Sequence, residues 1–136
     1  MLSKRSQYAL KALSYLTEKY QDGPVLISEI ARKKKIPLKF LENILLELKK
    51  AGVLESKKGK GGGYYFAVPP SQVPMAKIMR LLDGPIALLP CVSLNFYERC
   101  KNCDEKSCGL HDMMVNVRDV TLKVLEKRSV ADIAKK

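Results

Sequence analysis

Apolar residues recur at steps of three and four along the first fifty residues, which is the period of an α-helix with one buried face. The first helix is predicted over residues 3–20, and the turn at 22–24 ends it. Ser28 is predicted to be the N-cap of a short helix over residues 29–35. A tight turn leads to a third helix over residues 37–52, whose apolar face is made by Leu38, Leu41, Ile44, Leu45 and Leu48.

Strands and further helices follow. Two short strands are predicted at 53–56 and 64–68, on either side of a basic, glycine-rich loop. A helix at about 74–82, a cysteine segment and a long helix over residues 109–127 complete the pattern. The predicted fold class is mostly α with a small β-hairpin. It comprises a winged helix-turn-helix over residues 1–70 and a cysteine-containing region with a long C-terminal helix over residues 71–136, in one compact chain.

Charge points to a polyanionic partner. The 136 residues include 25 Lys and Arg against 14 Asp and Glu, a net charge of +11, and residues 1–68 alone carry 14 basic and 6 acidic residues, a net +8. Nucleic acid is the first expectation and an anionic membrane surface the second. There is neither a signal-peptide layout nor an apolar run of the roughly 20 residues that span a bilayer, so a cytoplasmic protein with reduced thiols is expected.

Catalysis is not predicted. The chain has a single His, and it shows neither a Gly-x-Ser-x-Gly pattern nor paired carboxylates. A cysteine nucleophile would have only His111 as an imidazole base, and no partner to orient that base is evident from the sequence.

The second helix of a helix-turn-helix normally enters the major groove with its N-terminal, outward residues against the base edges. Here those residues are Lys39, Glu42 and Asn43. Asn pairs with adenine, Glu accepts from cytosine, and Lys donates to guanine or phosphate. The alternative is an ordinary solvated helix face.

The basic loop of the hairpin fits the wing of such a domain. Lysines there would bind phosphate without reading sequence, and the glycines would let the backbone approach the DNA closely. The alternative is a flexible basic turn. The candidate DNA-binding residues are Ser28, Lys39, Glu42, Asn43, Lys57, Lys58, Lys60, Gly61 and Gly62.

Four cysteines fall within 18 residues, in the pattern Cys91-x8-Cys100-x2-Cys103-x4-Cys108. Such density is unusual for core packing, where Cys occurs singly. Thiolates bind iron–sulfur clusters and zinc, and they also form metal-free redox switches. The spacing alone leaves these three hypotheses open.

Specific motifs resemble those of a known family. They are Tyr8-Ala9-Leu10, Ser28-Glu29-Ile30-Ala31, Ile36-Pro37 with Phe40-Leu41-Glu42, Leu48-x2-Ala51-Gly52-Val53, Ser56-x2-Gly59-x-Gly61-Gly62-Gly63-Tyr64, Cys108-x2-His111 and Val130-Ala131-Asp132-Ile133. In these motifs the sequence resembles the IscR/NsrR/CymR-type (Rrf-type) family of bacterial winged-helix transcriptional regulators.

The resemblance implies a transcriptional regulator, expected to be a repressor, that binds palindromic double-stranded DNA as an intertwined homodimer through its long C-terminal helix. Lys58 falls where a wing Arg often enters the minor groove. The resemblance also implies an Fe–S cluster, 2Fe–2S or 4Fe–4S, that senses iron, redox state or nitric oxide. Its ligands would come from Cys91, Cys100, Cys103 and Cys108, with His111 as a further candidate; the alternatives are zinc or no metal, with control by thiol oxidation or a protein partner.

Overall fold

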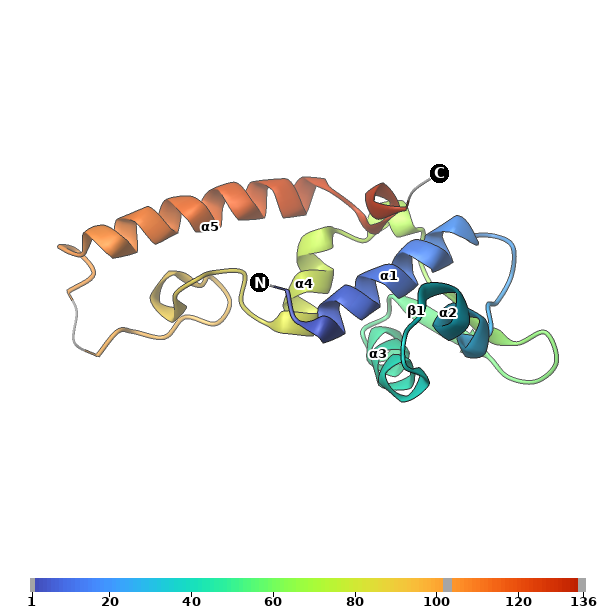
Figure 1. Cartoon of the computed structure of the whole chain (residues 1–136). Coiled ribbons are helices and arrows are strands. Elements are labelled where there is room, and N and C mark those ends of the chain that lie inside the picture. Colours follow the sequence, from blue (N-terminus) through green and yellow to red (C-terminus); the bar gives the residue numbers. More distant parts are fainter. Residues whose placement is uncertain (1, 102–103, 135–136) are drawn as a thin grey trace. The chain divides into compact units, whose positions relative to one another are not determined.

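The computed structural model describes residues 2–101 and 104–134, and the chain divides into two units (Figure 1). The first unit comprises Met1–Val73 with Ser129–Lys136, and the second comprises Pro74–Arg128. In order, the elements are α1 (Lys4–Glu18), α2 (Ile27–Lys34), α3 (Leu38–Lys50), β1 (Leu54–Lys57), β2 (Gly63–Phe66), η1 (Pro70–Gln72), α4 (Met75–Asp83), η2 (Pro90–Val92), α5 (Gly109–Lys127) and η3 (Val130–Ile133).

Helices α1, α2 and α3 pack against one another around an aliphatic core. Leu13, Ile30 and Leu41, one from each helix, are completely buried. Burial of a side chain of this size contributes about 1.5–3 kcal/mol to the stability of the unit. The predicted inward face of α3 is confirmed except for Leu38, which is 45% exposed at the first position of the helix.

The start of α2 differs from the prediction that Ser28 is its N-cap. The N-cap is Leu26, whose carbonyl accepts from the N–H groups of Glu29 and Ile30, and Leu26 makes no side-chain cap. Val25 exchanges two backbone hydrogen bonds of 2.8 Å with Tyr64 in the hairpin. This bridge holds the chain extended as far as Val25, so the first helical turn follows directly and Ser28 lies inside it, exposed to solvent.

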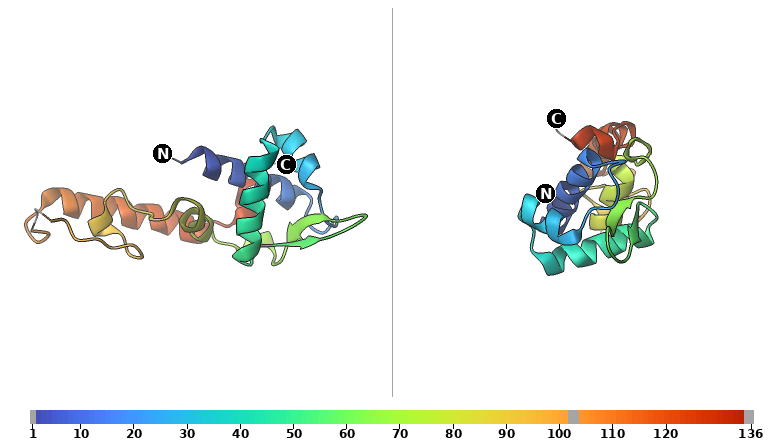
Figure 2. Two further views of the ribbon diagram at one scale, coloured as in Figure 1. Left: turned by 90° about the horizontal axis from the view of Figure 1, so that it is seen from below. Right: turned by 90° about the vertical axis from the view of Figure 1, so that its right-hand side faces the viewer.

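The two strands form an antiparallel hairpin in which Leu54 pairs with Phe66 and Lys57 with Gly63. The observed strands, residues 54–57 and 63–66, are offset from the predicted ranges. The N–H of Val53 donates to the carbonyl of Leu48, so this residue belongs to the turn after α3 rather than to β1. The tip of the hairpin projects beyond the helices of its unit (Figures 1 and 2).

The last described residues return to the first unit. Ser129 is the N-cap of η3, and its N–H donates to the Asp132 carboxylate at 2.8 Å in a capping box. The N–H of Val130 donates to the carbonyl of Val73 at 2.9 Å, and Val130 is fully buried. The C-terminal segment is therefore part of the fold that carries the hairpin.

The second unit contains α4, α5 and the described residues between them, of which η2 packs against α5 (Figure 1). The observed bounds of α5 match the predicted ones. One side of α5 is packed and buries Leu122, while the other side leaves a row of apolar residues exposed: Leu110, Met113, Val117, Val120 and Val124. In the described part of the chain, no helix combines the length and apolarity that a bilayer crossing requires.

The predicted fold class, mostly helical with one hairpin and a long C-terminal helix, is thus confirmed.

Candidate functional site

The outward face of α3 carries the three residues predicted to read DNA. Lys39, Glu42 and Asn43 are all exposed, while the opposite side of the helix lies in the core. Phe40, between them, is 45% exposed, and its ring meets that of Tyr8 in α1 edge-on at 5.6 Å between centroids. An ammonium, a carboxylate and an amide are therefore available to a ligand in front of α3.

A buried hydrogen bond ties α2 to α1. The Tyr15 hydroxyl donates to Oε2 of Glu29 at 2.6 Å, and this hydrogen bond, with burial of the phenol, raises the pKa of Tyr15 to about 12. Lys19 and Lys34 place their ammonium groups 5.8 and 5.9 Å from the centroid of the same ring. Sequence reasoning missed this cluster, because Tyr15 fits an ordinary core position and Glu29 an ordinary first-turn acid.

The loop between β1 and β2 is basic and shaped by glycine. Its exposed cationic side chains belong to Lys57, Lys58 and Lys60. Gly61 is also exposed, but Gly62 is buried and its N–H donates to the carbonyl of Gly59 within the loop. A Cβ on Gly62 would lie 2.2 Å from the carbonyl oxygen of Lys57, and one on Gly63, at φ +141°, would lie 2.2 Å from that of Val25. These two positions therefore require glycine.

Three cysteines line one cavity of about 410 Å³ in the second unit. Cys91 lies in η2, Cys100 in the loop that follows, and Cys108 directly before α5, and all three are half-buried. Cys103 falls outside the described residues. Charged residues and the histidine complete the polar lining: Glu98, Arg99, Lys101, Glu105 and His111.

Cys108 and His111 are brought together by the start of α5. Cys108 is the N-cap of the helix, and its Sγ accepts a hydrogen bond from the N–H of His111 at 3.4 Å. The Nδ1 atom of His111 is buried and has no hydrogen-bond partner among the described residues. A buried, unpartnered imidazole nitrogen beside thiols is suited to bind a metal ion.

Arg118, in the middle of α5, binds the backbone next to Cys91. The guanidinium of Arg118 donates from Nη1 to the carbonyl of Val92 at 2.8 Å, and it pairs with Asp119 at 2.8 Å. The Arg118 side chain is 15% exposed and Val92 is fully buried. Sequence reasoning did not single out Arg118, because its contact lies 26 residues away along the chain.

Two further hydrogen bonds form within the cysteine segment. The Tyr97 hydroxyl donates to Glu105, which raises the pKa of Tyr97 above its ordinary value. The N–H of Glu98 also donates to the carbonyl of Pro90 at 3.1 Å. The Glu105 carboxylate that lines the cavity is therefore held by a phenol from the same segment.

The donor set of this cavity fits an iron–sulfur cluster. Thiolates are the usual ligands of such clusters, and imidazole replaces thiolate in some of them. Among residues 2–101 and 104–134, no three His, Cys, Asp or Glu groups already lie close enough together to hold one metal ion. The residues that would hold such a cluster are Cys91, Cys100, Cys108 and His111.

Helix, turn, exposed helix and basic hairpin together define a winged helix-turn-helix protein. The model of the Rrf2 family, described as an iron-dependent transcriptional regulator, matches residues 2–136. The chain belongs to this family, which confirms the resemblance noted in the sequence.

Relatives agree with this assignment. An rrf2-like HTH-type transcriptional regulator of Rhodobacter capsulatus is 39% identical over 98% of this chain and 91% of its own length. The HTH-type transcriptional regulator CymR of Bacillus subtilis is 27% identical over 98% of this chain and 88% of its own.

Solved structures agree as well. The structure of CymR, the global cysteine regulator of B. subtilis, superposes with a TM-score of 0.81 at 25% identity, covering 98% of this chain and 95% of that one. The T. potens IscR structure, at 24% identity, covers 98% and 85% with a TM-score of 0.77 and shows likeness of fold. This protein is thus a transcriptional regulator of the HTH type.

Proposed function

We propose that this regulator is a cytoplasmic repressor that reads a specific duplex sequence with α3 and binds the neighbouring backbone with its wing. The observation that carries the proposal is the exposed polar face of α3, which belongs to the same unit as a hairpin bearing three exposed lysines. Asn43 pairs with adenine, Glu42 accepts from a cytosine amino group, and Lys39 donates to guanine or phosphate.

The hairpin and α2 supply contacts that do not read sequence. Lys57 and Lys60 bind phosphates, and Lys58 enters the minor groove. Gly61 allows the backbone of the loop to approach the DNA closely. Gly62 stabilises the conformation of the loop, because its N–H donates to a carbonyl within the loop. Ser28, exposed in the first turn of α2, donates its hydroxyl to a phosphate.

The proposed functional unit is a homodimer formed through α5. The exposed residues Leu110, Met113, Val117, Val120 and Val124 follow steps of three and four, the spacing at which apolar residues make a seam between two helices. Val120 is 67% exposed and Met113 is 59% exposed, and a second copy would cover both. A two-fold dimer would place two α3 helices about 34 Å apart, as a palindromic operator requires.

The proposed cofactor is an Fe–S cluster held by Cys91, Cys100 and Cys108 with His111, and Cys103 is a further thiol candidate. When bound, the cluster supplies a centre that responds to iron supply, oxygen, nitric oxide or redox state. The chain's own part is to hold the donors. Cys108 and His111 stand on the first turn of α5, and Arg118 fixes the backbone next to Cys91.

This arrangement couples the cavity to the dimer. At the beginning of α5, His111 and Leu110 line the cavity, and Leu110 and Met113 are also the first residues of the exposed seam. A change in the ligands would therefore move the beginning of the seam, and with it the spacing of the two α3 helices. A shift of a few ångströms suffices, because both helices must fit the same duplex.

DNA reading is tested by selecting binders from a random duplex pool with the full chain, then measuring affinities for the selected sequence. Asn43→Ala is expected to weaken specific binding by about tenfold or more, because a bidentate base contact is worth about 1–3 kcal/mol. Asn95→Ala, at an exposed asparagine of the second unit that lies outside the proposed seam, is the matched control and should bind normally. Enrichment of no sequence, or equal affinity of both variants, would refute the proposal.

Cluster binding is tested by anaerobic reconstitution with iron and sulfide, followed by metal analysis and a visible spectrum. A brown protein that bleaches on oxidation and changes its affinity for the selected duplex is expected. His111→Ala should lower the iron content or shift the spectrum. A colourless protein that binds one equivalent of zinc, or no metal at all, would exclude the cluster and leave the DNA-binding proposal standing.

A further inference from the structure

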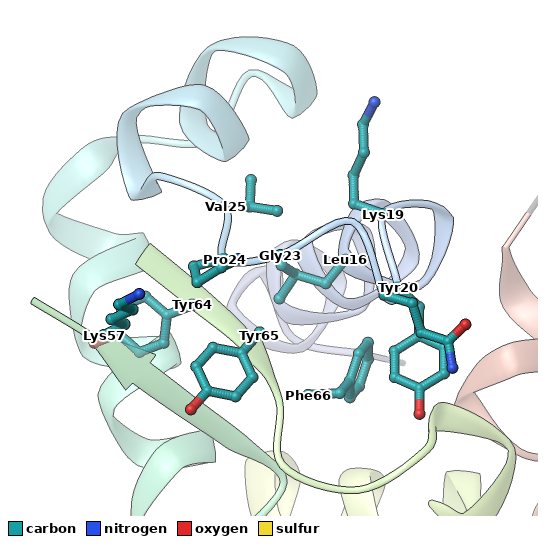
Figure 3. Close-up of a pocket in the computed structure, with 11 residues that line it drawn as sticks. Leu16, Lys19, Tyr20, Gly23, Pro24, Val25, Lys57, Tyr64, Tyr65 and Phe66 are labelled. Carbon is teal, nitrogen blue, oxygen red and sulfur yellow. The ribbon is translucent and has the colours of Figure 1, made fainter. Parts of the chain in front are cut away.

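Besides the cysteine-lined cavity of the second unit, a cavity of about 390 Å³ lies in the first unit at the base of the wing (Figure 3). Its walls come from the end of α1, the linker between α1 and α2, and the hairpin. None of the lining residues is a cysteine or belongs to the outward face of α3. The volume lies within the range of about 300–1,000 Å³ that is usual for small-molecule sites.

Aromatic rings are concentrated here. Four of the nine aromatic residues of the chain line the cavity: Tyr20, Tyr64, Tyr65 and Phe66. The Tyr20 and Phe66 rings lie next to each other (Figure 3). They meet edge-on, with 6.2 Å between their centroids and 85° between their planes. Leu16, Pro24 and Val25 provide the aliphatic part of the lining. Such walls accept a flat ring by stacking and edge contacts.

The charged groups of the lining have one sign. Lys19 and Lys57 are present, and among the residues that the structure describes no aspartate or glutamate lines the cavity. The Lys19 side chain points away from the aromatic rings of the cavity (Figure 3), and its ammonium group lies 5.8 Å from the centroid of the Tyr15 ring. Lys57, at the end of β1, also lines the cavity and is exposed, so its charge remains available to a ligand. A cationic ligand is therefore disfavoured and an anionic one favoured.

We propose that this cavity is an effector site for a planar aromatic carboxylate, with the ring among Tyr20, Tyr65 and Phe66 and the carboxylate at Lys57. The proposal goes beyond the cysteine-based switch and does not depend on it.

A ligand here would act on the wing. The linker and the hairpin already meet through the paired backbone groups of Val25 and Tyr64, and both residues line the cavity. A ring bound between these walls adds a second connection and restricts the hairpin relative to α1. The lysines at the hairpin tip would then be held in one position toward DNA, which changes duplex affinity.

The test is calorimetric titration of the full chain, without DNA, using indole-3-acetate as probe and indole-3-acetamide as its uncharged match. Saturation-transfer NMR reports which protons of the probe contact the protein, and the variants below report which side chains form the site. The acid is expected to bind about threefold more tightly than the amide, which is about 0.6 kcal/mol and within the range of a partly exposed ion pair.

Variants locate the site. Lys57→Gln should lower the affinity for the acid about threefold and leave that for the amide unchanged. Tyr20→Ala should weaken both about tenfold by removing a wall. Lys77→Gln and Tyr97→Ala, exposed residues of the second unit, are the matched controls and should bind like the wild type.

Absence of binding by both probes would overturn the proposal. If Lys57→Gln and the wild type bind the acid equally, and neither prefers it to the amide, the assignment of the carboxylate to Lys57 is wrong. This comparison does not need Tyr20→Ala, so it can be made even if that variant does not fold. These outcomes are independent of the duplex selection, so failure here leaves the DNA-binding proposal intact.

Discussion

Replacement of Tyr15 by Phe removes the hydrogen bond that joins α1 to α2. The phenol is 7% exposed and its oxygen lies 2.6 Å from the Glu29 carboxylate. A hydrogen bond to a charged group contributes about 1.5–3 kcal/mol. The pKa of Tyr15, raised from 10.0 to about 12, gives a similar figure, about 2–3 kcal/mol, from the differential interaction of the two protonation states. We therefore expect Tyr15→Phe to lower the free energy of unfolding by about 2 kcal/mol at pH 7.

The sign of the pH dependence follows from the raised pKa. The proton stays on Tyr15 more firmly in the folded than in the unfolded chain, so the stabilisation is complete below pH 10 and is lost as the pH rises through about 12. Tyr15→Phe lacks this contribution at every pH. The difference in stability between wild type and variant should therefore shrink from pH 9 to pH 12.

The assay is urea unfolding followed by circular dichroism at several pH values. Tyr97→Phe is the control, because its phenol also donates to a carboxylate but is 55% exposed. A Tyr15→Phe protein as stable as wild type at pH 7, or a stability difference that stays constant up to pH 12, would refute the reasoning.

Three further predictions concern the wing, the cysteine segment and the seam. Gly63→Ala should cost about 2–4 kcal/mol of unfolding free energy, because its φ is +141° and its Cβ would meet a carbonyl oxygen at 2.2 Å; a neutral effect in urea unfolding would contradict this. Arg118→Gln should let iodoacetamide alkylate Cys91 about tenfold faster in the metal-free protein, since the neighbouring backbone loses its charged donor, whereas an unchanged rate by mass spectrometry would argue against it. Val120→Lys should convert a dimer to monomers in analytical ultracentrifugation, while Lys123→Glu should not; equal behaviour of the two would count against the seam.

Local patterns predicted much of the fold. The helical period identified the buried residues Leu41, Ile44, Leu45 and Leu48, and the bounds of α5 followed from its apolar spacing. The start of α2 was misplaced, because it depends on a bridge between Val25 and Tyr64, two residues that are 39 positions apart in the chain. Cap preferences describe only the neighbouring residues, so Ser28 looked like a cap when it is not one.

Periodicity could not separate a core face from an uncovered one. The apolar residues of α5 fit both, and only the structure leaves Val120 and its neighbours exposed. The cysteine spacing likewise gave candidate donors without their surroundings. Folding buries the Nδ1 atom of His111 without a partner among the described residues and brings Arg118 to the carbonyl of Val92, next to Cys91. No local sequence motif predicts either feature.

The central claim is that the wing binds phosphates while α3 reads bases. Its most direct test is the salt dependence of affinity for the selected duplex, compared between the wild type, Asn43→Ala and a variant with Lys57, Lys58 and Lys60 all replaced by Ala. Each lost phosphate contact reduces the slope of log affinity against log salt by about 0.9, so the triple variant should lose about 2–3 from the slope for each subunit, or about 4–5 for the dimer. Asn43→Ala should keep the wild-type slope and lose preference for the selected sequence. A triple variant with an unchanged slope would contradict the account.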